Sequence, residues 1–381
     1  MKNQTSVITI TGWGDMGLAA GIIGLPNVGK STIFNALCSG SGKAEAANYP
    51  FCTIDPNHGI VAVPDVRLER ITAIIPTEKV VPAFLELIDI AGLVRGASKG
   101  EGLGNQFLGH IKSVDAVVHV VRCFEDGDVV HVDGSVDPLR DISTIDTELM
   151  FKDLETAEKG VLRVSKGAKS GDKEMKAKLA VYEKVQAKLS EGVPARKALD
   201  KEELEMISDM HLLSSKPVLY VTNVGENELL EDNRYVKLVA EHAAGENAQY
   251  VKISGKVESE ISELPVEERA GFLETLGLAE PGLTTLARSI YALLGLETFF
   301  TAGEKENRAW TINAGFTAPQ AAGVIHSDFE KGFIKADVYT LADLETYKTE
   351  SAIRAAGKIR SEGREYIVKD GDIMFFKFNV S

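Results

Sequence analysis

The sequence has little cysteine, no long apolar run and no excess of positive charge. Its three cysteines lack the paired spacing of zinc ligands or of a disulfide framework, which indicates packing residues in a reducing compartment. No apolar stretch approaches the ~20 residues that span a bilayer. The net charge of −14 argues against a protein whose whole surface binds nucleic acid, although it allows a local basic face. We therefore expect a cytoplasmic protein without a membrane segment.

The length and the order of apolar segments predict several domains. A chain of 381 residues is too long for one compact core. Continuous apolar runs alternate with helical stretches, which is typical of an α/β protein whose mostly parallel sheet is buried on both faces. The predicted strands are 18–23, 60–63, 84–88, 116–121, 217–221 and 250–253. Open sheets of this kind bind ligands at the carboxyl ends of their strands.

Two further segments differ from this pattern. Between 139 and 212 apolar residues recur every three or four positions and are interrupted near Gly167 and at 170–172, which predicts an antiparallel helical hairpin. Its apolar stripes indicate a packing seam, and the hairpin could also dock a partner. Residues 304–381 predict a small α+β domain, and they carry 11 Lys/Arg and 12 Asp/Glu, so the acidity lies in the rest of the chain.

The strongest motif is Gly24-Leu-Pro-Asn-Val-Gly-Lys-Ser31, which fits the phosphate-binding loop G-x-x-x-x-G-K-[ST] between a strand and a helix. Backbone N–H groups of such a loop face the phosphates, Lys30 reaches their β and γ oxygens, and the Ser31 hydroxyl binds Mg²⁺. The alternative is an ordinary glycine-rich turn. The predicted nucleotide contacts of the loop are Asn27, Val28, Gly29, Lys30, Ser31 and Thr32.

The motifs expected of a nucleotide switch follow the loop. Asp89-Ile-Ala-Gly92 ends a predicted strand, so Asp89 is expected to hold a Mg²⁺-bound water and the Gly92 N–H to meet the γ-phosphate. Thr53 is placed to reach Mg²⁺ when that phosphate is bound. The glycine-rich run 96–104 predicts a segment that becomes ordered on nucleotide.

The base-reading motif favours adenine. A GTPase of this layout would present N-K-x-D, but Asn223-Val224-Gly225-Glu226 lacks the lysine and has glutamate in place of aspartate. We therefore predict ATP, bound through the Asn223 side chain, the Val224 backbone and Glu226, with Ser254 in the last base-side loop. A GTPase with relaxed base specificity is the alternative.

These motifs resemble the YchF/Obg-like ATPase family. The resemblance also includes Asn48 to Thr53, His119 to Phe124 and His326 to Ile334, and it extends from Met16 to Ser381. It implies a P-loop ATPase domain (16–138 and 213–303), an inserted coiled coil (139–212) and a C-terminal TGS (β-grasp) domain (304–381). Residues 1–15 are expected to be an extension outside the site.

The resemblance also implies partners and catalytic features. It implies binding to the ribosome, through the large subunit or the whole particle, with rRNA contacted by the helical arm and the TGS domain, and a monomeric chain. An apolar residue, Leu93, follows D-x-x-G, so slow intrinsic turnover is expected. His131 matches the candidate catalytic histidine of the family, and Asn27 matches an asparagine that recruits K⁺ in relatives. A nucleotide-stabilised ribosome- or RNA-binding module with incidental hydrolysis is the competing interpretation.

Overall fold

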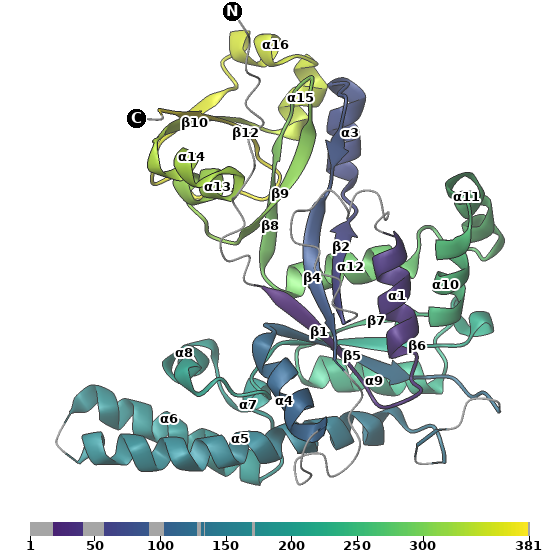
Figure 1. Ribbon diagram of the computed structural model, residues 1–381, viewed down its shortest axis with the longest axis vertical. Helices are drawn as coiled ribbons and strands as arrows, with labels where there is room; N and C mark the ends of the chain where they lie inside the picture. The colour runs from purple at the N-terminus through teal and green to yellow at the C-terminus, as the bar shows by residue number, and fades with distance from the viewer. Residues whose placement is uncertain are drawn as a thin grey trace, which may run out of the picture. The chain divides into compact units, whose positions relative to one another are not determined.

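The computed structural model describes residues 18–40, 57–90, 103–127, 131–132, 134–169 and 172–379 (Figure 1). The chain divides into two compact units. The larger, which we call the sheet-and-arm unit, contains Leu18–Val61 and Glu86–Leu294, and the smaller, the C-terminal unit, contains Ala62–Leu85 and Gly295–Ser381. Thr53, Gly92, Leu93 and the predicted extension 1–15 lie outside the described residues.

A six-stranded sheet in the order β2-β4-β1-β5-β6-β7 forms the centre of the sheet-and-arm unit. Its central strands β4, β1, β5, β6 and β7 run parallel to one another. The strands are β1 (Ala19–Ile23), β2 (His58–Val63), β4 (Ala83–Asp89), β5 (Ala116–Arg122), β6 (Val218–Asn223) and β7 (Gln249–Ile253). The predicted α/β fold and its six strands are therefore confirmed.

The central strands are buried because their sequences are apolar on both faces. Every residue of β1, β5 and β6 is buried, including the consecutive Val117-Val118 and Val120-Val121 pairs of β5. Helices can cover both sides of such a sheet only if the strands are joined by crossovers, and this arrangement brings the carboxyl ends of the parallel strands to one edge. The segments that follow β1, β5, β6 and β7 therefore meet at that edge.

Helices pack on the sheet in two groups. Helices α1, α10 and α12 contact one another or neighbouring strands, and α5 and α9 contact each other and strands β5 to β7. The helices outside the arm are α1 (Lys30–Gly40), α4 (Leu103–Ser113), α9 (Arg234–Gly245), α10 (Gly255–Glu263), α11 (Val266–Thr275) and α12 (Gly282–Leu293). Within the described ranges, no helix is long and apolar enough to cross a membrane.

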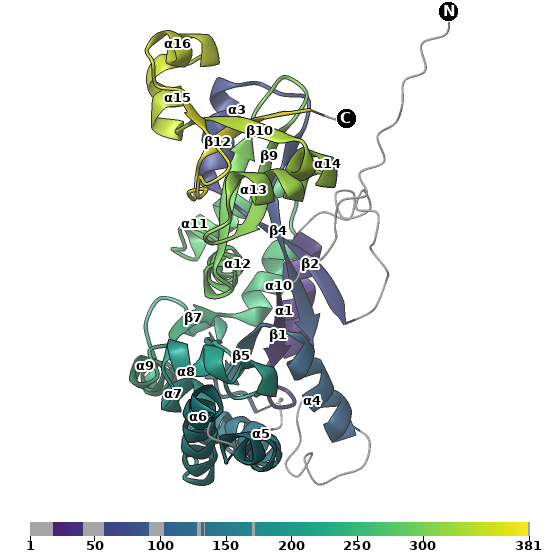
Figure 2. The same ribbon diagram turned by 90° about the vertical axis from the view of Figure 1, so that its left-hand side faces the viewer.

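The helical hairpin predicted between 139 and 212 is present as an arm (Figures 1 and 2). Asp137 caps the start of its first long helix, and the Asp172 carboxylate accepts from two backbone N–H groups at the start of the second. A seam that includes Ala157, Val164 and Tyr182 joins them. The arm consists of α5 (Pro138–Ala168), α6 (Lys173–Ser190), α7 (Ala195–Ala198), α8 (Lys201–Met206) and η2 (Ser208–Met210).

Buried polar contacts fix the root of the arm to the sheet region. The Asp153 carboxylate of α5 accepts from the backbone N–H groups of Leu213 and Ser214, each at 2.7 Å. A guanidinium nitrogen of Arg196 lies 2.8 Å from Asp146 of α5 and 3.0 Å from Glu246, which follows α9. Removing one partner of such a buried charge pair leaves the other uncompensated, at a cost of about 3–5 kcal/mol.

The C-terminal unit is built on a second six-stranded sheet, in the order β11-β10-β12-β8-β9-β3. Helices α13 and α14 pack on β9, β10 and β12, and Phe299, Trp310 and Phe376 are central residues of its core. The strands are β3 (Val80–Val81), β8 (Leu296–Thr301), β9 (Asn307–Asn313), β10 (Phe333–Tyr339), β11 (Arg360–Glu362) and β12 (Ile373–Phe378). The helices are α3 (Val66–Ile74), α13 (Ala318–Ile325), α14 (Ser327–Lys331), α15 (Leu341–Tyr347) and α16 (Glu350–Ala355).

The limits of the C-terminal unit differ from the predicted domain 304–381. Strand β8 begins at Leu296 and pairs antiparallel with β9, so the unit starts before Glu304. Strand β3 and helix α3 also contact β9, although they lie more than two hundred residues earlier in the chain. Such pairings are not encoded by local periodicity, and the domain limits 304–381 stay a prediction. The assignment of this unit as a β-grasp fold stays a prediction.

The arm seam yields a stability prediction at Gly160 in α5. A methyl group there would lie 2.9 Å from the Tyr182 ring and 3.2 Å from Met210, closer than packed atoms approach. Although alanine is the better helix former by about 1 kcal/mol, we expect Gly160→Ala to lower the free energy of unfolding by about 1–3 kcal/mol. Chemical denaturation measures this change.

Gly109 in α4 provides the matched control, because a methyl group there meets nothing within 4 Å. Gly109→Ala is expected to raise the free energy of unfolding by up to about 1 kcal/mol. If both substitutions stabilise the protein to the same extent, the close packing of Gly160 against Tyr182 is refuted.

Candidate nucleotide site

The predicted phosphate loop connects the end of β1 to the start of α1 at Lys30. A side chain at Gly24 would come within 2.7 Å of the Val120 carbonyl oxygen, and Gly29 has a φ of +91°, in the region that favours glycine. Asn27 also has a positive φ, of +64°. The Ile33 N–H donates to the Gly29 carbonyl at 3.0 Å and closes the first turn of the helix. The loop therefore reaches a helix N-terminus, where backbone N–H groups attract anions.

Three predicted site residues converge at this junction. Lys30 Nζ donates to Asp89 Oδ1 at 2.8 Å, and Ser31 Oγ donates to Asp89 Oδ2 at 3.2 Å. Asp89 ends β4, which is the parallel neighbour of β1, so the strand order brings the carboxylate to the loop. An ammonium, a hydroxyl and a carboxylate thus meet at the start of α1, as the two separate motifs predicted.

The side chain of Asn223 links the phosphate loop to the loop after β7. Its Nδ2 donates to the Val28 carbonyl at 2.8 Å, and its Oδ1 accepts from the Gly255 N–H at 2.9 Å. The amide passes so close to Gly29 that a methyl group there would lie 2.2 Å from Nδ2. Because both polar atoms are engaged with backbone, the geometry gives Asn223 a positioning role, and its contact with the base stays a prediction.

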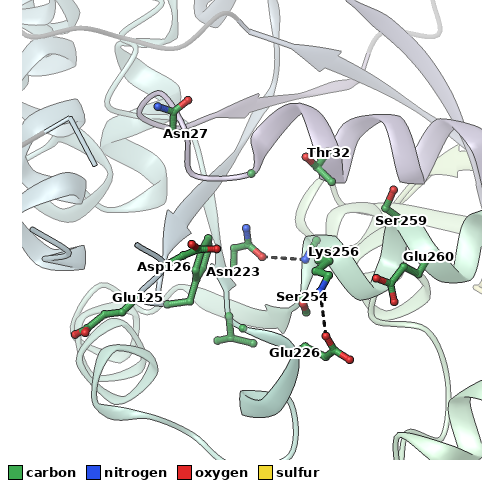
Figure 3. Close-up of a pocket in the computed structure, with 15 residues that line it drawn as sticks. Asn27, Thr32, Glu125, Asp126, Asn223, Glu226, Ser254, Lys256, Ser259 and Glu260 are labelled. Carbon is green, nitrogen blue, oxygen red and sulfur yellow. Dashed lines mark hydrogen bonds and ion pairs between the residues drawn. The ribbon is translucent and has the colours of Figure 1, made fainter. Parts of the chain in front are cut away.

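A cavity of about 720 Å³ opens beside these loops (Figure 3). Its walls come from the phosphate loop and α1, the segment after β5, the segment after β6, and the start of α10. Of the predicted nucleotide contacts, those that line it are Asn27, Gly29, Thr32, Asn223, Val224, Glu226 and Ser254. Val28, Lys30 and Ser31 lie next to this wall in the loop. The volume is in the range of small-molecule sites.

The sequence did not single out the residues that follow β5. Phe124, Glu125 and Asp126 line the cavity, and the buried Arg122 shapes their turn by donating to the Phe124 carbonyl at 3.1 Å. The rule that ligands bind at the carboxyl ends of parallel strands would have indicated this segment, because it follows a predicted strand. Ser259 and Glu260 of α10 were also missed, whereas Lys256 belongs to the predicted base-side loop that contains Ser254.

The cavity lining is acidic. Glu125, Asp126, Glu226 and Glu260 line it, and Lys256 is the only cation among the lining residues. Lys256 Nζ lies 3.2 Å from Glu226 Oε2, and this hydrogen bond and charge raise the pKa of the lysine. A hydrogen bond from Tyr235, with help from Arg234, lowers the pKa of Glu125. The wall near Glu226 therefore offers a carboxylate and an ammonium, while a nucleotide's phosphates would meet Lys30.

His131 lies away from the cavity lining. Its Nε2 is 2.9 Å from Asp141 Oδ2 in α5, and both side chains are buried. This contact joins the segment before the arm to the first turns of α5. The placement supports a structural role, and catalysis by His131 stays a prediction.

One other cluster has the composition of a metal site. Asp146, His242 and Glu246 bring three ligand atoms within 4.8 Å of one another. The Arg196 guanidinium contacts both carboxylates, so the cluster is already neutralised by a cation of the protein. We interpret it as part of the arm root.

Three features define the fold and site of a P-loop nucleoside triphosphatase. They are a parallel α/β sheet, a phosphate loop at the start of a helix, and an aspartate of the neighbouring strand that contacts the lysine and serine of that loop. A family model described as a 50S ribosome-binding GTPase matches residues 19–166. A second, YchF-GTPase_C, described as a protein of unknown function, matches residues 296–379. The chain belongs to the YchF family.

The relatives match over nearly the full length. Proteins named ribosome-binding ATPase YchF from Haemophilus influenzae and Bacillus subtilis are 53% and 52% identical, over 96% of this chain and 100% of each relative. The solved structure of the Schizosaccharomyces pombe YchF GTPase is 42% identical, covers 96% of this chain and 99% of its own, and has a TM-score of 0.84. The names of these relatives differ in the nucleotide, ATP or GTP.

The Asn223 bridge predicts an effect on nucleotide binding. Asn223→Asp places a carboxylate oxygen against the Val28 carbonyl, so we expect the affinity for nucleotide to fall by at least about tenfold, or about 1.4 kcal/mol. The free energy of unfolding should fall by about 1–3 kcal/mol, because Val28 and Asn223 are buried and the substitution leaves the Val28 carbonyl without its donor. Calorimetric titration and denaturation measure the two effects.

Ser259→Ala is the control, because Ser259 lines the same cavity on α10. We expect it to change affinity by less than about 0.5 kcal/mol, as is usual for substitutions away from buried contacts. Native-like affinity in Asn223→Asp would show that the bridge does not hold the loop for nucleotide.

Proposed function

We propose that the protein binds and hydrolyses ATP and couples the bound nucleotide to association with the ribosome. The meeting of Lys30, Ser31 and Asp89 at the start of α1 carries the first part, because these are the groups that nucleoside triphosphatases use for phosphates and their metal ion. The names of the relatives, ribosome-binding ATPases, support the second part. The fold is the scaffold of nucleotide switches.

The chemistry at the phosphates is electrostatic. The backbone N–H groups of the loop and the Lys30 ammonium bind and orient the phosphates. Because Lys30 is buried, its attraction to the phosphates is stronger than in water. Ser31 and Asp89 offer hydroxyl and carboxylate oxygens, the donors that Mg²⁺ prefers, so they fit the metal directly or through a bound water. Mg²⁺, when bound, neutralises charge that develops on the phosphates. Thr53 as a further ligand and Gly92 as a γ-phosphate contact stay parts of this proposal.

The cavity wall favours adenine over guanine. Guanine recognition needs an acidic side chain that accepts from the N1 and N2 protons, and here the Glu226 carboxylate is held by Lys256. Val224 and Ser254 line the cavity, which supports their proposed position beside the base. A GTPase is the second candidate, supported by the name of the Schizosaccharomyces pombe relative. Incidental hydrolysis in a binding module is the third.

We further propose that Asn27 recruits K⁺. It lies in the phosphate loop with a positive φ and lines the cavity, so its side chain belongs to the wall that a nucleotide would face. A monovalent cation there would supply positive charge during hydrolysis. The chain is proposed to act as a monomer in the cytoplasm, with rRNA contacted through the arm and the C-terminal unit.

Calorimetric titration with ATP and with GTP tests the base preference. We expect ATP to bind at least about tenfold more tightly, and Lys30→Ala to bind neither nucleotide measurably because it removes the buried ammonium. Glu226→Asp restores the acidic residue of the guanine motif. We expect this variant to show a smaller ratio of ATP affinity to GTP affinity. GTP affinity equal to or above that for ATP would favour the GTPase.

Turnover in K⁺ and Na⁺ buffers tests the role of Asn27. We expect hydrolysis at least about tenfold faster in K⁺ than in Na⁺, and loss of this difference in Asn27→Ala with little change in Na⁺. Thr32→Ser, a conservative change at the same wall, should keep the K⁺ response. Equal rates of the native protein in the two salts would exclude the cation site.

A further inference from the structure

Strands β2 and β4 each belong to both compact units. The boundary between the units falls after Val61 in β2 and after Leu85 in β4. Residues 62–85, which we call the inserted segment, contain α3 and β3 and belong to the C-terminal unit. The last residue of β4 is Asp89, whose carboxylate meets the lysine and the serine of the phosphate loop. One continuous strand therefore begins in the C-terminal unit and ends at the nucleotide site.

The buried side chain of Asn307 in β9 holds the middle of the inserted segment. Its Nδ2 donates to the Ile75 carbonyl at 2.8 Å and to Thr72 Oγ1 at 3.2 Å. Its Oδ1 accepts from the Gly303 N–H at 3.0 Å, and the backbone N–H of the same residue donates to the Lys79 carbonyl at 2.9 Å. The side-chain amide is thus hydrogen-bonded through both of its polar atoms, as burial requires.

Other contacts hold the two ends of the inserted segment. Near its start, the Arg67 guanidinium makes two hydrogen bonds to Asp370, at 2.6 and 3.2 Å, in the fork geometry of arginine and a carboxylate. Strand β3 pairs in parallel with β9. Near its end, Thr311 Oγ1 of β9 donates to the Phe84 carbonyl of β4 at 3.3 Å. The C-terminal unit therefore holds the first residues of β4 directly.

The last residues of β4 are held in the parallel sheet. Glu86 and Asp89 stand in register with Ala19 and Ile22 of β1. From Phe84 to Asp89 the strand covers about 17 Å, which is close to the full extension of the chain. A strand near full extension cannot lengthen to absorb a shift at one end. The contacts of the Asp89 carboxylate, at 2.8 and 3.2 Å, leave little tolerance for such a shift.

We propose that the C-terminal unit positions Asp89 for the metal ion through the inserted segment, with Asn307 as a positioning residue. The inference rests on the proposed nucleotide binding and names a part of the chain that controls it. Because Asp89 and Ser31 offer the oxygens that fit Mg²⁺, the position of Asp89 determines how much the metal adds to nucleotide affinity. Coupling between two sites is reciprocal, so the bound metal and nucleotide in turn stabilise the inserted segment in the C-terminal unit.

A purely stabilising role for these contacts has a different consequence. Losing such contacts would lower the affinity for nucleotide equally with and without metal, because unfolding removes the whole site. Mispositioning of Asp89 affects only the part of the affinity that the metal contributes. The backbone N–H groups of the phosphate loop and Lys30 attract the phosphates without metal. The ratio of nucleotide affinities with and without Mg²⁺, which we call the metal effect, therefore separates the two roles.

Calorimetric titration of the full chain with ATP, in Mg²⁺ and in EDTA, measures the metal effect. We expect the native chain to bind ATP at least about tenfold more tightly with Mg²⁺. Asn307→Ala should lose at least about fivefold of this effect with little change in EDTA, because a misplacement of about 1 Å can cost up to about a hundredfold. Arg67→Met, which removes the contact with Asp370, should show a loss of the same kind. Asp89→Asn sets the full loss.

Asp337→Ala is the matched control, because Asp337 is a buried polar residue of the same unit. Its partners Ser361, Arg354 and Lys377 lie outside the inserted segment. We expect this variant to keep the native metal effect even where denaturation shows that it is less stable. An equal loss in Asp337→Ala, a native metal effect in both Asn307→Ala and Arg67→Met, or a native metal effect in Asp89→Asn would overturn the proposal.

Hydrogen exchange gives a readout that does not depend on affinity. In the native chain, Mg²⁺ with ATP should slow amide exchange in residues 62–85 and in β9, and Asn307→Ala should abolish this protection. Unchanged exchange in both segments of the native chain, at saturating ATP and Mg²⁺, would contradict the proposal.

The native chain separates this proposal from the proposed function. If it binds no ATP, or binds ATP equally in Mg²⁺ and EDTA, the proposed nucleotide and metal site fails and the positioning of Asp89 fails with it. If the native chain shows the metal effect and both Asn307→Ala and Arg67→Met retain it, the proposed function stands and only the role of the inserted segment is overturned. Loss of the metal effect in these variants, with Asp337→Ala unaffected, supports both.

Discussion

The two hydrogen bonds of the Asn223 amide are the contacts on which the geometry of the nucleotide site depends. They join the carbonyl of Val28 in the phosphate loop to the N–H that opens α10. One side chain thereby fixes the position of the phosphate loop relative to the segment that begins α10. Gly29 is the residue that lets the amide come so close, because any β-carbon would occupy the space of Nδ2. A buried amide with both groups satisfied is rigid, and such rigidity favours preorganised binding.

Charge is distributed unevenly over the chain, and each local excess corresponds to a different task. Lys30 and the N-terminus of α1 put positive charge in the phosphate loop, whereas four carboxylates line the adjoining cavity. Salt screens exposed charges over about 10 Å, so such local excesses act on ligands near them. The net charge of −14 consequently describes neither of them.

The sequence predicted local features well and non-local ones poorly. Continuous apolar runs gave the six strands of the parallel sheet, and the breaks near Gly167 and 170–172 gave the turn of the arm, because these signals lie within a few residues. The contact of β9 with β3 and α3 was missed, since no local pattern encodes a pairing so distant in the chain. At the site, Lys30, Ser31 and Asp89 meet as their motifs predicted. The role of Asn223 depended on a backbone atom 195 residues away, which its own motif does not show.

Helix α5 gives the protein a mechanical property. Its 31 residues run without interruption from the segment beside His131 to the far end of the arm, a length of about 46 Å at 1.5 Å per residue. The root is held by Asp153 and by the contact of Arg196 with Asp146, so the helix behaves as a rigid lever with a fixed fulcrum. From Asp153 the helix extends about 22 Å to its end at Ala168, so a tilt of about 5° at the root displaces that end by about 2 Å. A small tilt at the root of the arm would therefore move the far end of α5 as a rigid body, by an amount comparable to an atomic radius.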